Sequence, residues 1–344
     1  MPYYFRLPPI NDLTIGQQSA LHEQDSICVS GGPGTGKSVV VLWRHIRNHN
    51  REIRNSLLLT YTKTLEIYLS ACASSQDGDA GDNVGRIFNW LTNEASNYDE
   101  IIIDEAQDVS PAAYSRIKNY SRSISYGADD GQIVYPEKAS TENQLKNIFR
   151  SNKSYVLGEN FRNSYEIMMF IRSIFPNRLV PQETINNLLQ KSIRGNKPIL
   201  LVSNFDLDKQ KKAIIDVINQ FKSDTHNIAV LVPFRDKVNY YYELIQNHNI
   251  ICTKYESDDD SIGVIENIHV TTFKSAKGTE FDTVIIPDFE EMFLNISIMD
   301  VVEENDYYVA FTRARRNLYL ISNNDLKFMN FSDETKSTFQ KVIL

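Results

Sequence analysis

Eight consecutive residues, 31 to 38, have the types and the spacing of a phosphate-binding loop. They read GGPGTGKS and fit the pattern G-x-x-x-x-G-K-[ST]. In such a loop, backbone N–H groups and a helix N-terminus face the phosphates, the lysine reaches the β- and γ-phosphates and the hydroxyl binds Mg²⁺. The residues predicted to bind the nucleotide are Gly31, Gly32, Pro33, Gly34, Thr35, Gly36, Lys37 and Ser38. We expect Lys37 to be catalytic and Ser38 to be a metal ligand.

An acidic pair, Asp104 and Glu105, follows the apolar run of residues 101–103. A continuous apolar run of this kind is typical of a strand buried on both faces of a parallel sheet. Ligands of such sheets bind outside the carboxyl ends of the strands. We therefore expect Asp104 to help hold Mg²⁺ and Glu105 to polarise the attacking water.

Apolar strands alternate with helical stretches along the whole chain, which predicts a doubly wound α/β fold. The polar stretch before residue 155 predicts a boundary between two domains, residues 1–152 and residues 153–344. The small, polar residues 74–82 predict an exposed loop. The pattern allows no assignment for the tail after Asn323.

The composition fits a globular protein of 344 residues with a net charge of −8 and 42% hydrophobic residues. The negative charge argues against indiscriminate binding to polyanions, although it leaves room for a local basic groove. Three cysteines far apart suit free thiols in a reducing cytosol, so we expect a cytoplasmic protein. No apolar run has membrane-spanning length, and we expect no membrane partner.

Further stretches resemble the motifs of superfamily 1 helicases of the UvrD/Rep type, in the same order. The matching stretches are IIIDEAQD at 101–108, GADDGQIVY at 127–135, LGENFRN at 157–163, VTTFKSAKGTEFDTVIIP at 270–287 and VAFTRARRNLYL at 309–320. The resemblance implies two tandem RecA-like P-loop domains with ATP in the interdomain cleft. It implies hydrolysis of ATP with Mg²⁺.

The resemblance also assigns roles to residues outside the loop. It implies that Gln17 reads adenine, that Phe161 stacks on it and that Glu280 contacts the ribose. The residues that it places at the γ-phosphate are Gln132, Arg162 and Arg313. Positive groups there suit the charge that develops during phosphoryl transfer.

Contacts with nucleic acid are predicted at five positions. Thr60 and Tyr61 resemble the motif Ia of the family, and Tyr135 is a candidate platform for base stacking. Thr271 and Lys274 could touch phosphates. For each of these residues a purely structural role is almost as well supported.

The chain lacks the large accessory insertions of the family, and Lys274 stands where the family usually has a histidine. The first functional hypothesis is therefore an ATP-driven motor on single-stranded nucleic acid, DNA rather than RNA, with 3′-to-5′ polarity. The alternative is an ATPase switch of a bacterial defence, plasmid or phage complex that licenses a nuclease or other effector protein. A GTPase is disfavoured because no Asn-Lys-x-Asp guanine signature is present.

Overall fold

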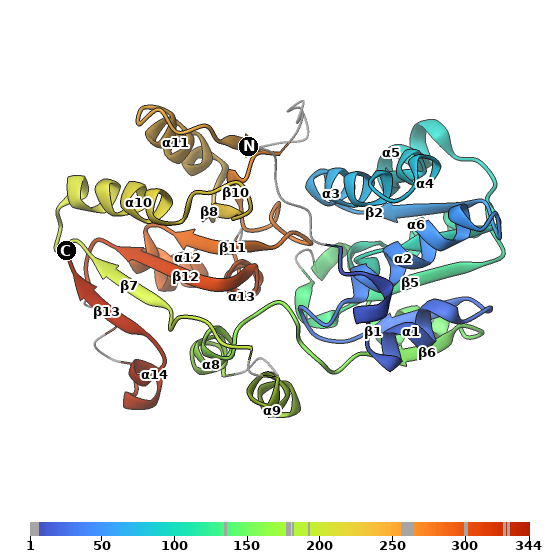
Figure 1. The fold of residues 1–344 in the computed structure, drawn as a ribbon, viewed down its shortest axis with the longest axis horizontal. Helices are drawn as coiled ribbons and strands as arrows, with labels where there is room; N and C mark the ends of the chain where they lie inside the picture. The colour runs from blue at the N-terminus through green and yellow to red at the C-terminus, as the bar shows by residue number, and fades with distance from the viewer. Residues whose placement is uncertain are drawn as a thin grey trace. The chain divides into compact units, whose positions relative to one another are not determined.

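A computed structural model describes the chain in two compact units, one that ends at Asn160 and one that begins at Phe161 (Figure 1). The residues that it does not describe are 1–6, 134–135, 177–179, 181, 192, 256–264, 299–301, 326–327 and 329–330. In the described part of the chain, no helix is both long enough and apolar enough to cross a membrane.

The first unit contains a parallel sheet of six strands in the order β3-β2-β4-β5-β1-β6. Its strands are β1 (Ile27–Ser30), β2 (Ser56–Thr60), β3 (Val84–Arg86), β4 (Glu100–Ile103), β5 (Ile124–Ala128) and β6 (Lys153–Val156). The central strands are buried along their whole length, as expected for strands covered on both faces.

Helices cover both faces of this sheet. They are α1 (Ile15–His22), α2 (Lys37–Asn50), α3 (Lys63–Ser74), α4 (Gly78–Asp82), α5 (Ile87–Asn89), α6 (Pro111–Ile117) and α7 (Glu142–Ile148). Successive residues of a strand point to opposite faces. Leu58 and Ile102 accordingly pack with α1 to α4, whereas Leu57 and Ile101 pack with α5 to α7.

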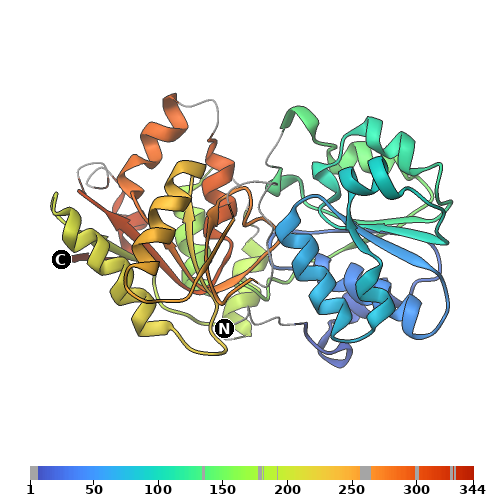
Figure 2. The ribbon, with the colours of Figure 1, turned by 90° about the horizontal axis from the view of Figure 1, so that it is seen from above.

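The second unit contains a parallel sheet of seven strands in the order β13-β7-β12-β11-β8-β10-β9. Its strands are β7 (Ile199–Val202), β8 (Ile228–Val232), β9 (Thr253–Tyr255), β10 (Ile268–Thr272), β11 (Phe281–Ile286), β12 (Ala314–Ser322) and β13 (Gln340–Ile343). Figure 2 shows the strands of each sheet lying side by side between helices.

Its helices are α8 (Tyr165–Ile174), α9 (Gln182–Gln190), α10 (Leu207–Phe221), α11 (Arg235–Gln246), α12 (Met292–Ile298), α13 (Glu304–Phe311) and α14 (Asp333–Ser337). Helices α10 and α11 form an aliphatic core with one face of the sheet. Aromatic rings tie α8 to α13, where Phe170 stacks on Phe311 with ring centroids 5.7 Å apart. The predicted fold class, α/β with two parallel sheets flanked by helices, is confirmed.

The division between the units differs from the predicted boundary after residue 152. Strand β6 pairs with β1 in parallel, from Ile27 opposite Lys153 to Ser30 opposite Val156. The first unit therefore runs on to Asn160. The sequence does not reveal this, because a polar stretch looks the same whether it ends a domain or leads to an edge strand.

Two further segments differ from the sequence-based expectations. Residues 74–82 are not a simple exposed loop, because α3 continues to Ser74 and α4 follows with Ala80 fully buried. Asp77 caps α4 by accepting a hydrogen bond from Ala80 N. The unassigned tail forms α14 and then β13, which pairs with β7 at the edge of the second sheet.

Candidate nucleotide site

The predicted phosphate loop lies between β1 and α2 at the carboxyl end of the first sheet. Gly36 caps α2 in the left-handed region, with a φ of 86°, and a Cβ atom there would collide with Gln17 Nε2. A Cβ atom on Gly31 would collide with the carbonyl oxygen of Leu157. Both positions therefore require glycine, and the loop leaves the first N–H groups of a 14-residue helix without intrahelical acceptors.

Lys37 is buried and its ammonium is fully engaged. Its Nζ donates to the carbonyl oxygens of Gly31 (2.6 Å) and Gly32 (2.9 Å) and to Asp129 Oδ2 (3.2 Å). An ammonium has three protons, so these three acceptors account for all of them. The lysine thus closes the loop on itself and connects it to the end of β5.

Gln17 supports the loop in the described structure. Its Nε2 donates to Thr35 O (3.0 Å) and its Oε1 accepts from Thr14 N (2.9 Å), as part of the capping box of α1. Asn160, for which the sequence predicted no role, donates from Nδ2 to Pro33 O (2.9 Å). The segment after β6 therefore holds the same loop from another side.

Asp104 lies directly after β4 and has the surroundings of a metal ligand. It is buried, it is hydrogen-bonded by the Ser38 hydroxyl, and its Oδ2 has no hydrogen-bond partner among the described residues. Burial, followed by the negative charge of Glu105, raises the pKa of Asp104 to about 7. A buried carboxylate oxygen beside a serine hydroxyl fits a divalent cation, which would relieve this unfavourable environment.

The described residues contain no group of three or more His, Cys, Asp or Glu side chains placed to hold a metal ion. Mg²⁺ bound to Asp104 and Ser38 would therefore take most of its ligands from phosphate and water. That coordination is usual for Mg²⁺ in nucleotide sites.

Glu105 has a left-handed backbone, with a φ of 55°, which is unusual for a residue with a side chain. Its Oε2 accepts from Gln107 Nε2 (2.5 Å), and Gln107 Oε1 accepts from Asp129 N (3.1 Å). Asp129 Oδ2 also accepts from Gln132 Nε2 (2.6 Å). The predicted base and the predicted γ-phosphate sensor are therefore linked through Gln107 and Asp129, two residues to which the sequence assigned no role.

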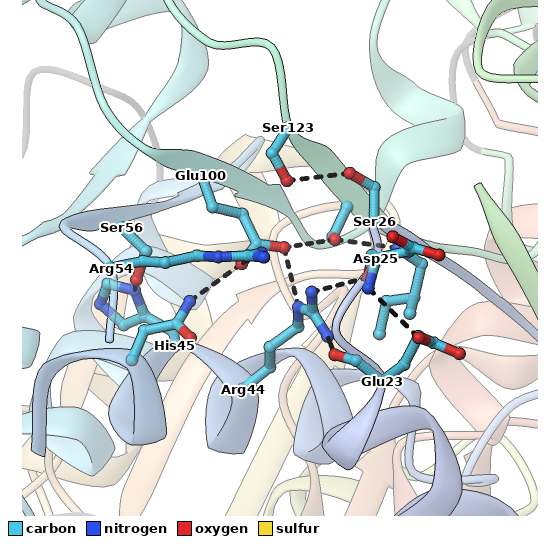
Figure 3. A network of polar contacts seen from close by, with 12 residues as sticks. Glu23, Asp25, Ser26, Arg44, His45, Arg54, Ser56, Glu100 and Ser123 are labelled. Carbon is cyan, nitrogen blue, oxygen red and sulfur yellow. Dashed lines mark hydrogen bonds and ion pairs between the residues drawn. The ribbon is translucent and has the colours of Figure 1, made fainter. Parts of the chain in front are cut away.

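The helix that carries Lys37 is anchored at its middle by a buried ion pair (Figure 3). Arg44 Nε lies 2.7 Å from Glu100 Oε1, and the side chains are 1% and 0% exposed. The remaining nitrogens of Arg44 donate to the carbonyl oxygens of Glu23 and Asp25. Burial opposes ionisation of Glu100, but the charge of Arg44 and the hydrogen bonds from Ser125, Arg44 and Asn48 together lower its pKa. The pair thus fixes α2 to the start of β4.

In the second unit, Glu280 joins two arginines. It forms ion pairs with Arg162 Nε (3.0 Å) and with Arg315, which the sequence did not single out. Burial opposes ionisation of Glu280, but Arg315 and Arg162 together lower its pKa. The ring of Phe161 lies beneath Lys191 Nζ, 4.3 Å from the ring centroid.

Arg313, the predicted second arginine at the γ-phosphate, is fully buried in the second unit. It donates from Nε to Val309 O (3.0 Å), from Nη1 to Thr279 O (3.2 Å) and from Nη2 to Thr312 Oγ1 (3.1 Å). Its described contacts therefore join α13 to the loop before β11. Sequence context cannot distinguish this buried arginine from Arg315, whose side chain is 24% exposed.

Two of the predicted nucleic-acid contacts lie at β2. Thr60 is the last residue of this strand and is fully buried, so its hydroxyl does not face solvent. Tyr61 follows it and is half-buried. Tyr135 lies outside the described residues.

The other two predicted contacts lie at and after β10. Thr271 is fully buried and donates from Oγ1 to Tyr255 O (3.0 Å) in the neighbouring strand. Lys274 forms an ion pair with Asp306, with Nζ and Oδ2 3.7 Å apart. Burial raises the pKa of Asp306 to about 6, and Lys274 opposes this shift. Of this pair, only Lys274 retains partial exposure for an external phosphate.

The α/β fold and the Walker-type loop define a broad class of nucleotide-binding proteins. Comparison with sequence families shows to which family within this class the chain belongs. The model of the Schlafen group 3, DNA/RNA helicase domain matches residues 24–208, more than half of the chain. The chain belongs to this family. The model of the UvrD-like helicase C-terminal domain matches residues 243–325, which confirms the predicted resemblance to UvrD-type helicases.

A protein of Acanthamoeba polyphaga mimivirus, provisionally named an ATP-dependent DNA helicase (R568), is 28% identical over 253 residues. The match covers 64% of this chain, which spans about a third (34%) of the relative's length. The PRRSV helicase structure has a TM-score of 0.47 at 14% identity and covers 92% of this chain and 56% of that one. A complex of arterivirus nonstructural protein 10 (helicase) with DNA has a TM-score of 0.43 at 15% identity, and the match covers 90% of this chain and 63% of that one.

Proposed function

We propose that this chain is an ATP-hydrolysing motor that moves along single-stranded nucleic acid. The observation that carries the proposal is the assembly of Lys37, Ser38, Asp104 and Glu105 at the carboxyl end of one parallel sheet. Phosphoryl transfer needs a phosphate cradle, a metal ligand and a group that orients water, and these residues supply all three. Membership of a DNA/RNA helicase domain family supports nucleic acid as the polymer along which the motor moves.

The first unit supplies the chemistry in this proposal. Lys37 and the N-terminal N–H groups of α2 bind the phosphates, and Ser38 and Asp104 hold Mg²⁺. When it is bound, Mg²⁺ neutralises the charge that develops on the phosphate oxygens. Glu105 orients the attacking water and accepts its proton. The left-handed backbone at Glu105 turns its side chain away from the direction that a continuing strand would give it.

The second unit supplies charge and nucleotide recognition. We propose that Arg162 stabilises the γ-phosphate in the transition state and that Phe161 stacks on adenine. Arg162 is only partly buried, whereas Arg313 would have to exchange several internal hydrogen bonds to reach a ligand. Arg162 is therefore the stronger candidate. That Gln17 reads adenine and that Glu280 contacts the ribose remain predictions. A protein partner and a cytoplasmic location also remain predictions.

Single-stranded DNA with 3′-to-5′ movement is the finer proposal. The name of the viral relative refers to DNA, whereas the family description refers to both DNA and RNA. Because this chain spans about a third of that relative, unwinding of a duplex is not part of the proposal.

The first test measures ATP hydrolysis with no nucleic acid, with single-stranded DNA and with single-stranded RNA. We expect stimulation by single-stranded DNA, and loss of turnover with retained ATP binding in Glu105→Gln. Glu94→Gln removes the same charge from an exposed residue of the same unit and should change neither property. Hydrolysis that no nucleic acid alters would contradict the motor and favour a switch driven by another partner.

A second test measures direction. The protein, given ATP, should displace streptavidin from DNA biotinylated at the 5′ end faster than from DNA biotinylated at the 3′ end. The reverse preference would contradict the proposed polarity but not the motor. Equal, ATP-independent rates would contradict translocation itself.

A further inference from the structure

Asp129 holds Lys37, which the proposed function assigns to the phosphates, and Gln132, which the helicase resemblance places at the γ-phosphate. It follows β5 and is buried, and its Oδ2 accepts from Lys37 Nζ (3.2 Å) and from Gln132 Nε2 (2.6 Å). Its Oδ1 accepts from Gly131 N (3.0 Å), which fixes the orientation of the carboxylate. A carboxylate that binds an ammonium and an amide in this way has the charge and acceptor pattern of a phosphate oxygen pair.

This arrangement puts Asp129 in competition with a nucleotide. All three protons of Lys37 are in use, two on loop carbonyl oxygens and one on Asp129. A phosphate that binds Lys37 must replace one of these acceptors, and Asp129 is the only anion among the three. Once it is displaced, its buried negative charge remains close to the incoming phosphate and repels it.

We propose that Asp129 is a resident substitute for the terminal phosphates of the nucleotide, which keeps Lys37 and Gln132 occupied until ATP displaces it. The inference rests on the proposed nucleotide binding and adds a residue that sets its affinity. Asp129 thereby lowers affinity for nucleotide, and it protects a buried lysine from being left without a counter-ion when the site is empty.

Gln107 connects Asp129 to Glu105, the proposed base, so that displacement of Asp129 by a phosphate also affects Glu105. Its Oε1 accepts from Asp129 N (3.1 Å) and its Nε2 donates to Glu105 Oε2 (2.5 Å). Gln107 is fully buried, so both contacts are shielded from water. A shift of residue 129 when the phosphate arrives is therefore passed to Glu105, and Gln107 acts as a positioning residue.

The test is titration of a fluorescent ADP or ATP analogue in EDTA, so that neither hydrolysis nor metal binding contributes. Asp129→Asn keeps the shape of the side chain but removes its charge. We expect the Kd to fall by about ten- to a hundredfold, because a charged hydrogen bond to Lys37 no longer has to be replaced. Asp129→Ser, which retains a capping oxygen for Gly131 N, should also tighten binding.

Asp130→Asn is the matched control, since Asp130 is the next residue along the chain and the substitution removes the same charge from an exposed side chain. It should leave the Kd unchanged. In a Lys37→Met background, Asp129→Asn should tighten binding less than it does in the wild type, because the competition for Lys37 is absent and only the repulsion between residue 129 and the phosphate is relieved. A loss of stability would weaken binding, so a tighter complex cannot arise from damage to the fold.

The possible outcomes separate the inference from the proposed function. If the wild-type chain binds neither ADP nor ATP, the proposed function fails and the inference with it. If the wild type binds nucleotide and both Asp129 variants bind it equally or more weakly, the inference alone is overturned. For Gln107→Leu, we expect a fall in kcat of about tenfold or more with little change in nucleotide Kd. An unchanged kcat would refute the link to Glu105.

Discussion

Glu100→Gln should destabilise the first unit by about 3–5 kcal/mol, the usual cost of removing one partner from a buried ion pair. In the wild type, Oε1 accepts from Arg44 Nε and Ser125 Oγ, and Oε2 accepts from Asn48 Nδ2 and Arg54 Nη1. Glutamine has nearly the same shape, but its amide nitrogen would face two of these donors. Arg44 would also remain buried without its counter-ion.

Urea unfolding followed by tryptophan fluorescence measures this change in the relevant unit. The chain has two tryptophans, Trp43 and Trp90, and both are buried in the first unit. The signal therefore reports on that unit even if the two units unfold separately, in which case a single free energy for the whole chain would have no meaning.

Glu66→Gln is the matched control within the same unit. Glu66 pairs with Arg86 at 3.2 Å, but the side chains are 25% and 24% exposed. Water screens such a pair, so its loss should cost less than about 1 kcal/mol. If Glu100→Gln costs no more than Glu66→Gln, the ion pair does not anchor α2 and the reasoning from burial is wrong.

Three further predictions follow from the site and the core. Gly36→Ala should weaken nucleotide binding, measured by fluorescence titration, since the added methyl group strains a left-handed residue and collides with Gln17. His45 is buried with a pKa lowered to about 4 by burial. Its contribution to stability should be complete above pH 6.5 and should fall by about 3 kcal/mol as the pH drops to 4. In urea unfolding, His45→Gln should therefore lose less stability than the wild type over this range. Arg313→Ala should destabilise the second unit by about 2–4 kcal/mol, because internal carbonyl groups lose their donor. Circular dichroism measures this as the unfolding step that the tryptophans of the first unit do not report. A variant of wild-type stability with low kcat would instead support direct contact with the nucleotide.

The local features of this protein could be predicted from its sequence. The phosphate loop follows from glycines whose left-handed or crowded backbone no other residue can adopt, together with the lysine and serine at fixed offsets. The buried strands are recognisable because a strand covered on both faces needs a continuous apolar run, as residues 101–103 show. Such requirements act over a few residues, so they leave a local pattern.

The sheet to which each edge strand belongs could not be predicted in this way. Strand β6 has largely exposed side chains, and β13 at the end of the chain is similar. Such strands lack an apolar pattern because an edge strand is held largely by backbone hydrogen bonds, which any non-proline residue can form. Which sheet they join depends on strands far away in the sequence.

Only the tertiary structure decided the partners of the chemical groups. The sequence placed Lys37 in a phosphate loop, but its buried partner Asp129 lies 92 residues later. It placed Arg313 and Arg315 two residues apart, yet folding buries the first completely and leaves the second partly exposed beside Glu280. Side-chain type determines what a group can bind, whereas the packing of distant elements determines which group it meets and whether water still reaches it.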